Sequence, residues 1–478
     1  MKLADALRAP RHRESAGAAW WRHAGWALLA PLVVYGVFAF RDLAVPGLYM
    51  DAVNPDYQAA WLVRGSRVIP DWTFPDNAIA GWYRLPLLNS LYGGNTPAYL
   101  GLLFFTVAGF GVESVRIFHA LLGALVLCAF WWGLRQWRVP KAWVAAVLCV
   151  LAADPTFVFG WRTQFYLQMF PLLFLALGLG LLGRHQADAG DARKEYRTLF
   201  LAGALLGFSA YGYFVFAFHA AAAIAVYAHA AGWRQGRLAA VGLPLVAGAA
   251  AGWLPYAYAH FSIVQQAGLP SYLQELRNLQ STYGVIDAGQ GGFLARAEAV
   301  AQRIGHMVRA RGITHAVLAS DTRHGLAAQC TALVLWSGPF LLAAAWFTRR
   351  NRPVVLGGDP VGAWLLLCTV LAAMLGLHLV FGFAIGRPLG LQHYIMLLPV
   401  LYTLVLVPLA ILIARPEAAA GRAPRSLAVL GAAAVLATAN ATSSATFAGR
   451  LSASGGVGLY SDATNALAAE VRKLPAGT

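Results

Sequence analysis

The stretch that decides the fold is VGAWLLLCTVLAAMLGLHLVFGF, residues 361–383, which contains no Asp, Glu, Lys or Arg. A run of about 20 apolar residues is long enough to cross the hydrocarbon core of a bilayer as an α-helix. No water reaches the peptide groups in that core, so a single crossing segment has to be helical. The stretch therefore predicts a transmembrane helix.

Similar apolar segments recur along the whole chain. Of its 478 residues, 59% are hydrophobic and only 12% are charged, about half of the roughly 25% charged share of a soluble domain. The composition predicts an all-α polytopic integral membrane protein with no room for a separate soluble catalytic domain. With the first stretch there are twelve candidate segments, at about 24–40, 96–112, 117–134, 142–153, 166–183, 198–213, 215–231, 238–258, 330–347, 361–383, 394–414 and 426–445.

Lysine and arginine indicate the orientation, because short cytoplasmic loops hold an excess of both. The arginine-rich residues 1–23 are expected inside. If residues 96–112 cross the membrane, the basic clusters at 135–141 and 348–360 fall outside. If residues 96–112 instead dip in and return, or lie along the outer interface, every basic cluster falls inside. We adopt this second arrangement, which has about 11 transmembrane helices with outer-face loops and interfacial helices.

The net charge of +16 follows largely from this asymmetry. In the adopted arrangement 74 inside residues hold 20 Lys or Arg, whereas about 201 outside residues hold 16. The positive charge then faces the anionic inner leaflet. We therefore expect membrane lipids and no nucleic acid as partners, and a location in the cytoplasmic (inner) membrane with the N-terminus inside and the C-terminus outside.

The same arrangement divides the chain into regions. We expect a cytoplasmic N-terminal segment, a transmembrane module that includes the first outer loop (42–116), a large outer loop, a second set of transmembrane helices and an outer tail. In that order they cover residues 1–23, 24–258, 259–329, 330–445 and 446–478.

The first outer loop places two acidic residues close to the membrane surface. It reads Gly-Leu-Tyr-Met-Asp51-Ala-Val-Asn-Pro-Asp56. The Asn-Pro pair before Asp56, and the apolar spacing after it, predict an interfacial amphipathic helix with Asp56 near its positively polarised first turn. A carboxylate beside the hydrocarbon boundary is costly and tends to be functional. Asp51 and Asp56 are therefore candidate functional residues.

This loop resembles that of a known family. An Asp directly after the first span, followed fourteen residues later by Gly65, is similar to the first outer loop of polyprenyl-phosphate-sugar glycosyltransferases of the GT-C fold. These glycosyltransferase family 39-like enzymes include protein O-mannosyltransferases and aminoarabinose transferases. The resemblance covers roughly residues 25–260, and the chain departs from it at Ala52, where the family usually has Glu. Further agreement comes from Asn95-Thr96-Pro97, Gly111-Val-Glu-Ser-Val-Arg116, Asp154-Pro155 with Arg162, and His393-Tyr394 with Pro399.

The resemblance implies a GT-C-like bundle that moves a sugar from a polyprenyl-phosphate carrier to an acceptor on the outer face of the membrane. It implies catalytic roles for Asp51 as general base, for Asp56, and for Asp154 as an acid that orients the acceptor or a metal. The remaining matched or neighbouring positions are expected to bind the donor and its phosphate. They are Tyr57, Arg84, Arg162, Arg387 and His393.

The chemistry of this transfer needs few groups. A base removes the proton of the acceptor hydroxyl as it attacks the anomeric carbon, an effect typically worth 10²- to 10⁴-fold. A phosphate leaving group needs no general acid, only cations or a metal to hold its charge. Direct displacement inverts the anomeric centre. We expect no tightly bound organic cofactor, and the sequence leaves open whether a divalent metal takes part.

Two other functions stay open at this point. A polymerase or ligase of lipid-linked polysaccharide would share this topology, and the large outer loop contains Arg303, His306, Arg309 and Arg311. A secondary transporter would instead place charged or broken helices near the bilayer midplane, whereas the acidic residues here gather at outer loops. The sequence identifies neither the sugar nor the acceptor, which is a glycan, a lipid or a protein.

Overall fold

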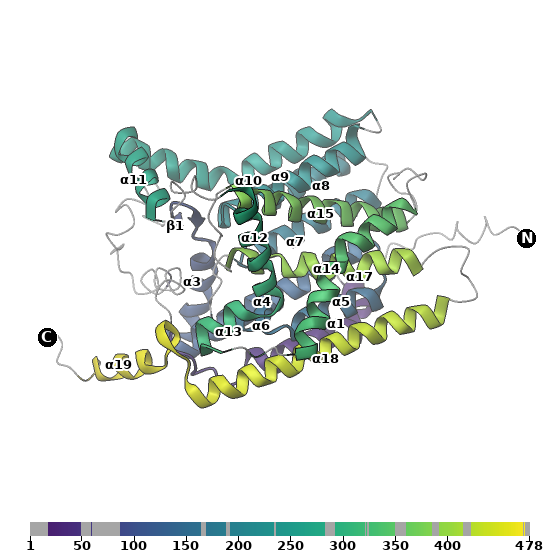
Figure 1. Ribbon diagram of the computed structural model, residues 1–478. Coiled ribbons are helices and arrows are strands. Elements are labelled where there is room, and N and C mark those ends of the chain that lie inside the picture. Colours follow the sequence, from purple (N-terminus) through teal and green to yellow (C-terminus); the bar gives the residue numbers. More distant parts are fainter. Residues whose placement is uncertain are drawn as a thin grey trace, which may run out of the picture.

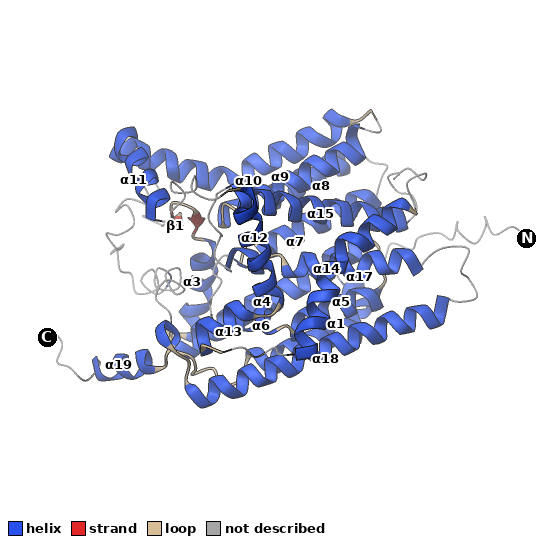
Figure 2. Cartoon of the chain, viewed as in Figure 1, coloured by secondary structure: helices blue, strands red, loops and turns tan. Residues whose placement is uncertain are grey.

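The computed structural model is almost entirely helical (Figure 1). Figure 2 shows one small sheet among the helices, the antiparallel pair β1 (Leu88–Ser90) and β2 (Gly93–Gly94). The structure describes residues 18–48, 59, 87–163, 169–187, 192–233, 236–282, 292–320, 322, 325–348, 360–384, 392–413, 422–471 and 473.

The helices up to the large outer loop include all of the first eight predicted apolar segments. They are α1 (Ala18–Ala39), α3 (Thr96–Ala108), α4 (Val112–Gln136), α5 (Lys141–Ala153), α6 (Pro155–Arg162), α7 (Leu172–Ala187), α8 (Ala192–Gly212), α9 (Phe216–Tyr227), continued by the π-helical turn Ala228–Gly232, and α10 (Leu238–Ala267).

The second half of the chain contains three helices of the large outer loop and the remaining apolar segments. They are α11 (Leu269–Thr282), α12 (Phe293–Val308), α13 (Arg311–Leu318), α14 (Gly325–Phe347), α15 (Pro360–Ala384), α16 (Gln392–Ile395), α17 (Leu398–Ile413), α18 (Arg422–Ser454) and α19 (Ala463–Val471), with a 3₁₀ turn at Gly458–Tyr460. Each of the twelve apolar segments is thus helical over most of its described residues.

Fewer of these helices meet the length and hydropathy requirements of a complete membrane span than the sequence predicts. Among the described residues, four helices are long and apolar enough, or five if the bent pair α5 and α6 forms one span. Five shorter apolar helices of 10–17 residues accompany them. The expected count of about 11 spans is therefore not established, although the membrane-protein class is supported by these long apolar helices.

Close helix contacts depend on small residues. Adding a Cβ atom at Gly203 or Gly207 of α8 would bring it within about 2 Å of the carbonyl oxygens of Leu245 and Ala249 in α10. Gly248 of α10 approaches the backbone of α8 equally closely. Small residues let two helix backbones approach in this way, and the Gly- and Ala-rich sequence at 240–252 predicts such a contact. The structure confirms it.

Helix α3 differs in direction from the long helices. Figure 1 draws it across their ends, on the same side of the picture as β1, α11 and α19. Its side chains Leu103 and Val107 are 72% and 90% exposed, while Phe105 on the opposite side is buried. Thirteen residues extend about 20 Å at 1.5 Å per residue, which is less than the roughly 30 Å of the hydrocarbon core.

Candidate functional site

Only part of the predicted site falls within the described residues. Asp154, Arg162 and His393 do. The other five candidates, and the amphipathic helix predicted after Asp56, lie outside the described residues except for Ala59, which is helical and packs near Gly101 of α3. Those five candidates are Asp51, Asp56, Tyr57, Arg84 and Arg387.

Asp154 lies at the break between α5 and α6 and is fully buried. Pro155 has no N–H and fits the first position of α6, while Asp154 is the residue before it. Its Oδ1 accepts hydrogen bonds from the backbone N–H groups of Thr156 (2.8 Å) and Phe157 (3.4 Å). This is the N-cap arrangement that satisfies the free N–H groups of a helix start. The carboxylate therefore stabilises the 62° bend between the two helices.

The second oxygen of Asp154 connects this bend to the C-terminal helices. Its Oδ2 accepts a hydrogen bond of 2.6 Å from the hydroxyl of Tyr402 in α17. Asn440 of α18 donates to that hydroxyl (3.2 Å) and to the carbonyl of Val150 (3.0 Å). Ser444 of α18 donates to the carbonyl of Ala153 at 2.7 Å. A buried polar network thus joins α5, α17 and α18 around Asp154.

Arg162 lies at the other end of α6, about 12 Å from Asp154 at 1.5 Å of rise per residue. Its side chain is almost fully buried and donates to backbone carbonyls of the chain that leads into the first outer loop. The acceptors are Phe38 (3.4 Å), Asp42 (2.5 Å) and Val45 (3.1 Å). Arg162 therefore holds the segment that precedes Asp51.

Arg116 is a second buried arginine beside the same segment. It donates to the carbonyls of Arg162 (3.1 Å), Gly47 (3.2 Å) and Pro46. Residues 42–47, which we call the loop base, are thus held by two guanidinium groups that are desolvated and bonded to backbone oxygens. The sequence motif at 111–116 includes Arg116, but sequence reasoning gave it no role. Its position directly before the apolar segment 117–134 was the one sequence feature that could have pointed to it.

The far end of the first outer loop is held by tyrosines. The hydroxyl of Tyr211 donates to the carbonyl of Leu87 (2.6 Å), and that of Tyr256 donates to Leu91 (2.7 Å). A Cβ atom at Gly94 would lie 2.5 Å from the Tyr211 carbonyl oxygen, so only glycine fits there. Both ends of the loop that contains Asp51 are therefore fixed to the helix bundle.

His393 belongs to the same end of the bundle. Its ring stacks on Tyr213, with centroids 5.6 Å apart, and its Nδ1 lies 2.5 Å from the Tyr213 hydroxyl. Tyr213 in turn contacts Tyr92 of the β1–β2 turn edge to face, at 6.1 Å between centroids. His393 thus lies near the far end of the first outer loop, and Arg162 lies near its base.

A histidine pair near this group was missed by sequence reasoning. His219 of α9 and His378 of α15 are both fully buried, and their ring nitrogens lie 3.1 Å apart. The ring of Tyr394, next to His393, lies 5.3 Å from that of His378. Each histidine stands alone in an apolar segment, so the sequence gave no signal that they would meet.

The electrostatics of the loop base centre on Asp42. A hydrogen bond from Ser452 lowers the pKa of the Asp42 carboxyl, and Arg41 and Arg162 lower it further. Among the described residues, no group of three or more His, Cys, Asp or Glu side chains could hold a metal ion. The acidic residues Asp51 and Asp56 are not among those residues.

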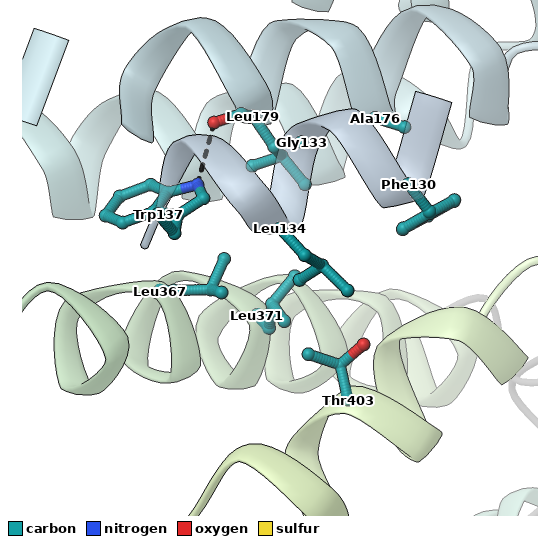
Figure 3. Close-up of a pocket in the computed structure, with 9 residues that line it drawn as sticks. All are labelled: Phe130, Gly133, Leu134, Trp137, Ala176, Leu179, Leu367, Leu371 and Thr403. Carbon is teal, nitrogen blue, oxygen red and sulfur yellow. Dashed lines mark hydrogen bonds between the residues drawn. The ribbon is translucent and has the colours of Figure 1, made fainter. Parts of the chain in front are cut away.

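A small pocket among the helices, separate from the loop base, is shown in Figure 3. It is lined by apolar side chains of α4, α7 and α15, together with Thr403 of α17. Trp137, which follows the C-terminal end of α4, donates to the carbonyl of Leu179 there at 2.8 Å. Arg116 lies at the opposite end of α4, and the pocket has no charged lining residue. It is therefore not the candidate site.

The comparisons with known proteins identify the fold. No protein-family model matches the sequence, and no curated protein matches it. The structure is similar to that of ArnT from Cupriavidus metallidurans bound to undecaprenyl phosphate, with a TM-score of 0.52 and 14% identity, over 97% of this chain and 82% of that one. The chain has the GT-C fold. The sequence-based expectation of this fold is thereby confirmed.

Two further structures resemble the chain less. One is ArnT of the same organism in the apo state, with a TM-score of 0.49, 15% identity and coverage of 91% of this chain and 78% of that one. The other is the Archaeoglobus fulgidus oligosaccharyltransferase in the apo form, with a TM-score of 0.49 and 16% identity. The likeness covers 90% of this chain and 57% of the oligosaccharyltransferase chain.

Proposed function

We propose that this protein is a membrane glycosyltransferase that moves a sugar from a polyprenyl-phosphate carrier to an acceptor on the outer face of the cytoplasmic membrane. The observation that carries the proposal is the likeness, over most of both chains, to an ArnT structure bound to undecaprenyl phosphate. The anchored first outer loop supports it, because a catalytic carboxylate has to be held in a fixed position relative to its substrates.

The proposed orientation has the N-terminus inside and the C-terminus outside. The loop base, the β1–β2 turn, Arg162 and His393 gather at one end of the bundle, which we take as the outer end. Arg135 and Arg138 lie at the opposite end of α4 from Arg116, near the carboxyl end of α7, where Arg138 donates to the carbonyl of Ala187. Positive residues favour the cytoplasmic side. The short, crosswise α3 supports an interfacial position for residues 96–112.

In the proposed mechanism Asp51 takes the proton of the acceptor hydroxyl as that hydroxyl attacks the anomeric carbon of the donor. The bond from the anomeric carbon to the phosphate oxygen breaks, and polyprenyl phosphate leaves with the electron pair. The anomeric centre inverts. Asp56 and Tyr57 are proposed to orient the acceptor and the sugar, from the amphipathic helix that the sequence predicts after Asn54-Pro55.

The leaving phosphate needs positive charge or hydrogen-bond donors. Of the three arginines predicted for this role, Arg162 already donates to three carbonyls of the chain entering the first outer loop. We therefore propose Arg84 and Arg387 as the direct phosphate ligands, with His393 beside them, and Arg162 as a support for the loop. We propose Asp154 as the acid that fixes the α5–α6 bend on which Arg162 depends.

The test is an amide substitution of the proposed base. Asp51→Asn keeps the side-chain shape but removes the proton acceptor, so sugar transfer should fall at least 10²-fold. Transfer is measured by mass spectrometry of cell-envelope lipids and glycans from cells with the wild-type chain, the variant or no protein, which also names the acceptor.

Asp56→Asn is the matched control, because Asn also caps helices well. It should reduce transfer less than Asp51→Asn does. Normal transfer by both variants would show that neither Asp51 nor Asp56 is the base.

A further inference from the structure

The C-terminal turn, residues 452–465, is packed against the base of the first outer loop. The backbone N–H of Gly47 donates to the carbonyl of Tyr460 at 3.0 Å. The side-chain amide of Asn465 donates to the carbonyl of Ala44 at 3.0 Å. These contacts join positions more than 400 residues apart in the sequence. The first outer loop is thus bonded to the end of the chain.

A charged contact adds to these backbone contacts. The hydroxyl of Ser452, at the end of α18, donates to the Asp42 carboxylate. Asp42 also pairs with Arg41 at 3.3 Å. Hydrogen bonds to an ionised acceptor are stronger than neutral ones, so this contact favours one position of the loop base relative to α18.

The loop base and the C-terminal turn approach each other so closely that a side chain would not fit between their backbones. A Cβ atom at Gly47 would lie 1.9 Å from the carbonyl oxygen of Ser461 and 2.1 Å from the hydroxyl of Thr464. Gly456, whose φ of +89° suits glycine, lies on the other side of the contact, where a Cβ atom would meet Pro46 at 2.8 Å. Both backbones therefore touch directly, through glycine.

The same turn also reaches the large outer loop. The N–H of Val457 donates to the carbonyl of Val317 in α13 at 2.9 Å. Just before the turn, Arg450 of α18 donates to the hydroxyl of Ser320 at 3.3 Å. Figure 1 shows the yellow C-terminal turn beside α13 and below α3. One short segment thus contacts both outer loops.

We propose that the C-terminal turn is a positioning element of the transferase, which fixes the loop base together with Arg116 and Arg162 and so sets the position of Asp51. The inference rests on the proposed function. Asn465 and Ser452 are positioning residues in this account, because they act on the reacting groups only through the loop base. Transfer should depend on them through the turnover number and not through donor affinity.

The experiment uses the full-length protein reconstituted in lipid vesicles, with four variants. Gly47→Ala should push the turn away from the loop base, and Asn465→Ala combined with Ser452→Ala should remove the two side-chain contacts. Gly449→Ala in α18 is the control, because a Cβ atom there meets nothing within 4 Å. Ser452→Thr keeps the hydroxyl and should behave as the wild type.

Two readouts separate positioning from folding and from the proposed function. Hydrogen exchange of the backbone at 41–48 should accelerate about tenfold in the two disruptive variants, the factor expected for a lost hydrogen bond, with unchanged exchange in α4 and α5. With polyprenyl-phosphate sugar as donor, kcat should fall about tenfold or more while KM for the donor stays within about twofold.

The outcomes are distinguishable. Unchanged exchange at 41–48 in Gly47→Ala would overturn the contact itself. Accelerated exchange with normal kcat would overturn the positioning role while leaving the proposed transferase activity intact. If the wild type transfers no sugar, the proposed function and the positioning role fall together, whereas the exchange result still tests the contact independently.

Discussion

The side chain of Asp154 combines two tasks that substitutions can separate. Asp154→Ala removes the N-cap, at about 1 kcal/mol, and leaves the buried Tyr402 hydroxyl without its acceptor, at about 1–3 kcal/mol. We expect the free energy of unfolding to fall by about 2–4 kcal/mol, measured by denaturant unfolding in detergent micelles. Asp154→Asn still caps α6 but turns an N–H₂ donor toward the Tyr402 hydroxyl, so it should lose about 1 kcal/mol less than Asp154→Ala, the contribution of the cap.

Sugar transfer by the Asp154→Asn variant shows whether Asp154 takes part in catalysis or only in the structure. A stable Asn variant with normal transfer would assign Asp154 to the α5–α6 bend alone, and a stable variant without transfer would assign it to the acceptor or a metal. Wild-type stability of Asp154→Ala would contradict the buried network with Tyr402 and Asn440.

Sequence motifs located some of these side chains but not their partners. Arg162 stands out in the sequence because it follows Asp154-Pro155 at a family spacing, yet its acceptors lie 117 to 124 positions earlier in the chain. His393 likewise meets Tyr213, 180 positions away. Hydropathy and spacing carry no information about such long-range pairs. Arg116 was missed as a support of the loop for the same reason.

At the level of the helices, the close contact between α8 and α10 can be tested by substituting its glycines. A Cβ atom at Gly207 would lie 2.0 Å from the carbonyl oxygen of Ala249. Overpacking of this kind typically costs about 1–3 kcal/mol, so Gly207→Ala should lower the free energy of unfolding by that amount in detergent. Gly431→Ala, with nothing within 4 Å, is the control and should be neutral or slightly stabilising. Equal stability of both variants would refute the close contact.

Helix positions were predictable from the sequence, whereas helix breaks and extensions were not. Each of the twelve apolar segments is helical over most of its described residues, because the bilayer pattern of long apolar runs is strong. The short helix α6 was not predicted, since its eight residues are neither long enough nor apolar enough to stand out. Helix α10 runs to Ala267, nine residues beyond the predicted end. The added part contains polar residues such as His260, which bonds the Tyr272 hydroxyl at 2.8 Å.

In the whole molecule, the C-terminal turn lies between the two outer loops at one end of the helix bundle and contacts both. Composition predicted the membrane class, the basic residues predicted which side faces outward, and the first-loop motif predicted the GT-C fold. The C-terminal residues 446–478 were expected only as an outer tail. Their contacts with the loop base could not be read from the sequence, because no local pattern marks a contact across the full chain.

The nature of the sugar donor distinguishes the proposed lipid-dependent transferase from an enzyme that uses nucleotide sugars. An active site on the outer face has no access to cytoplasmic nucleotide sugars, so the sugar has to arrive on a lipid carrier that has crossed the membrane. The purified protein in vesicles is given envelope extract as acceptor, with either polyprenyl-phosphate sugars or nucleotide sugars as donors. We expect the protein to consume the lipid-linked sugar, to release polyprenyl phosphate and to leave the nucleotide sugar unused. If it used the nucleotide sugar and left the lipid-linked donor intact, the proposed function would be wrong.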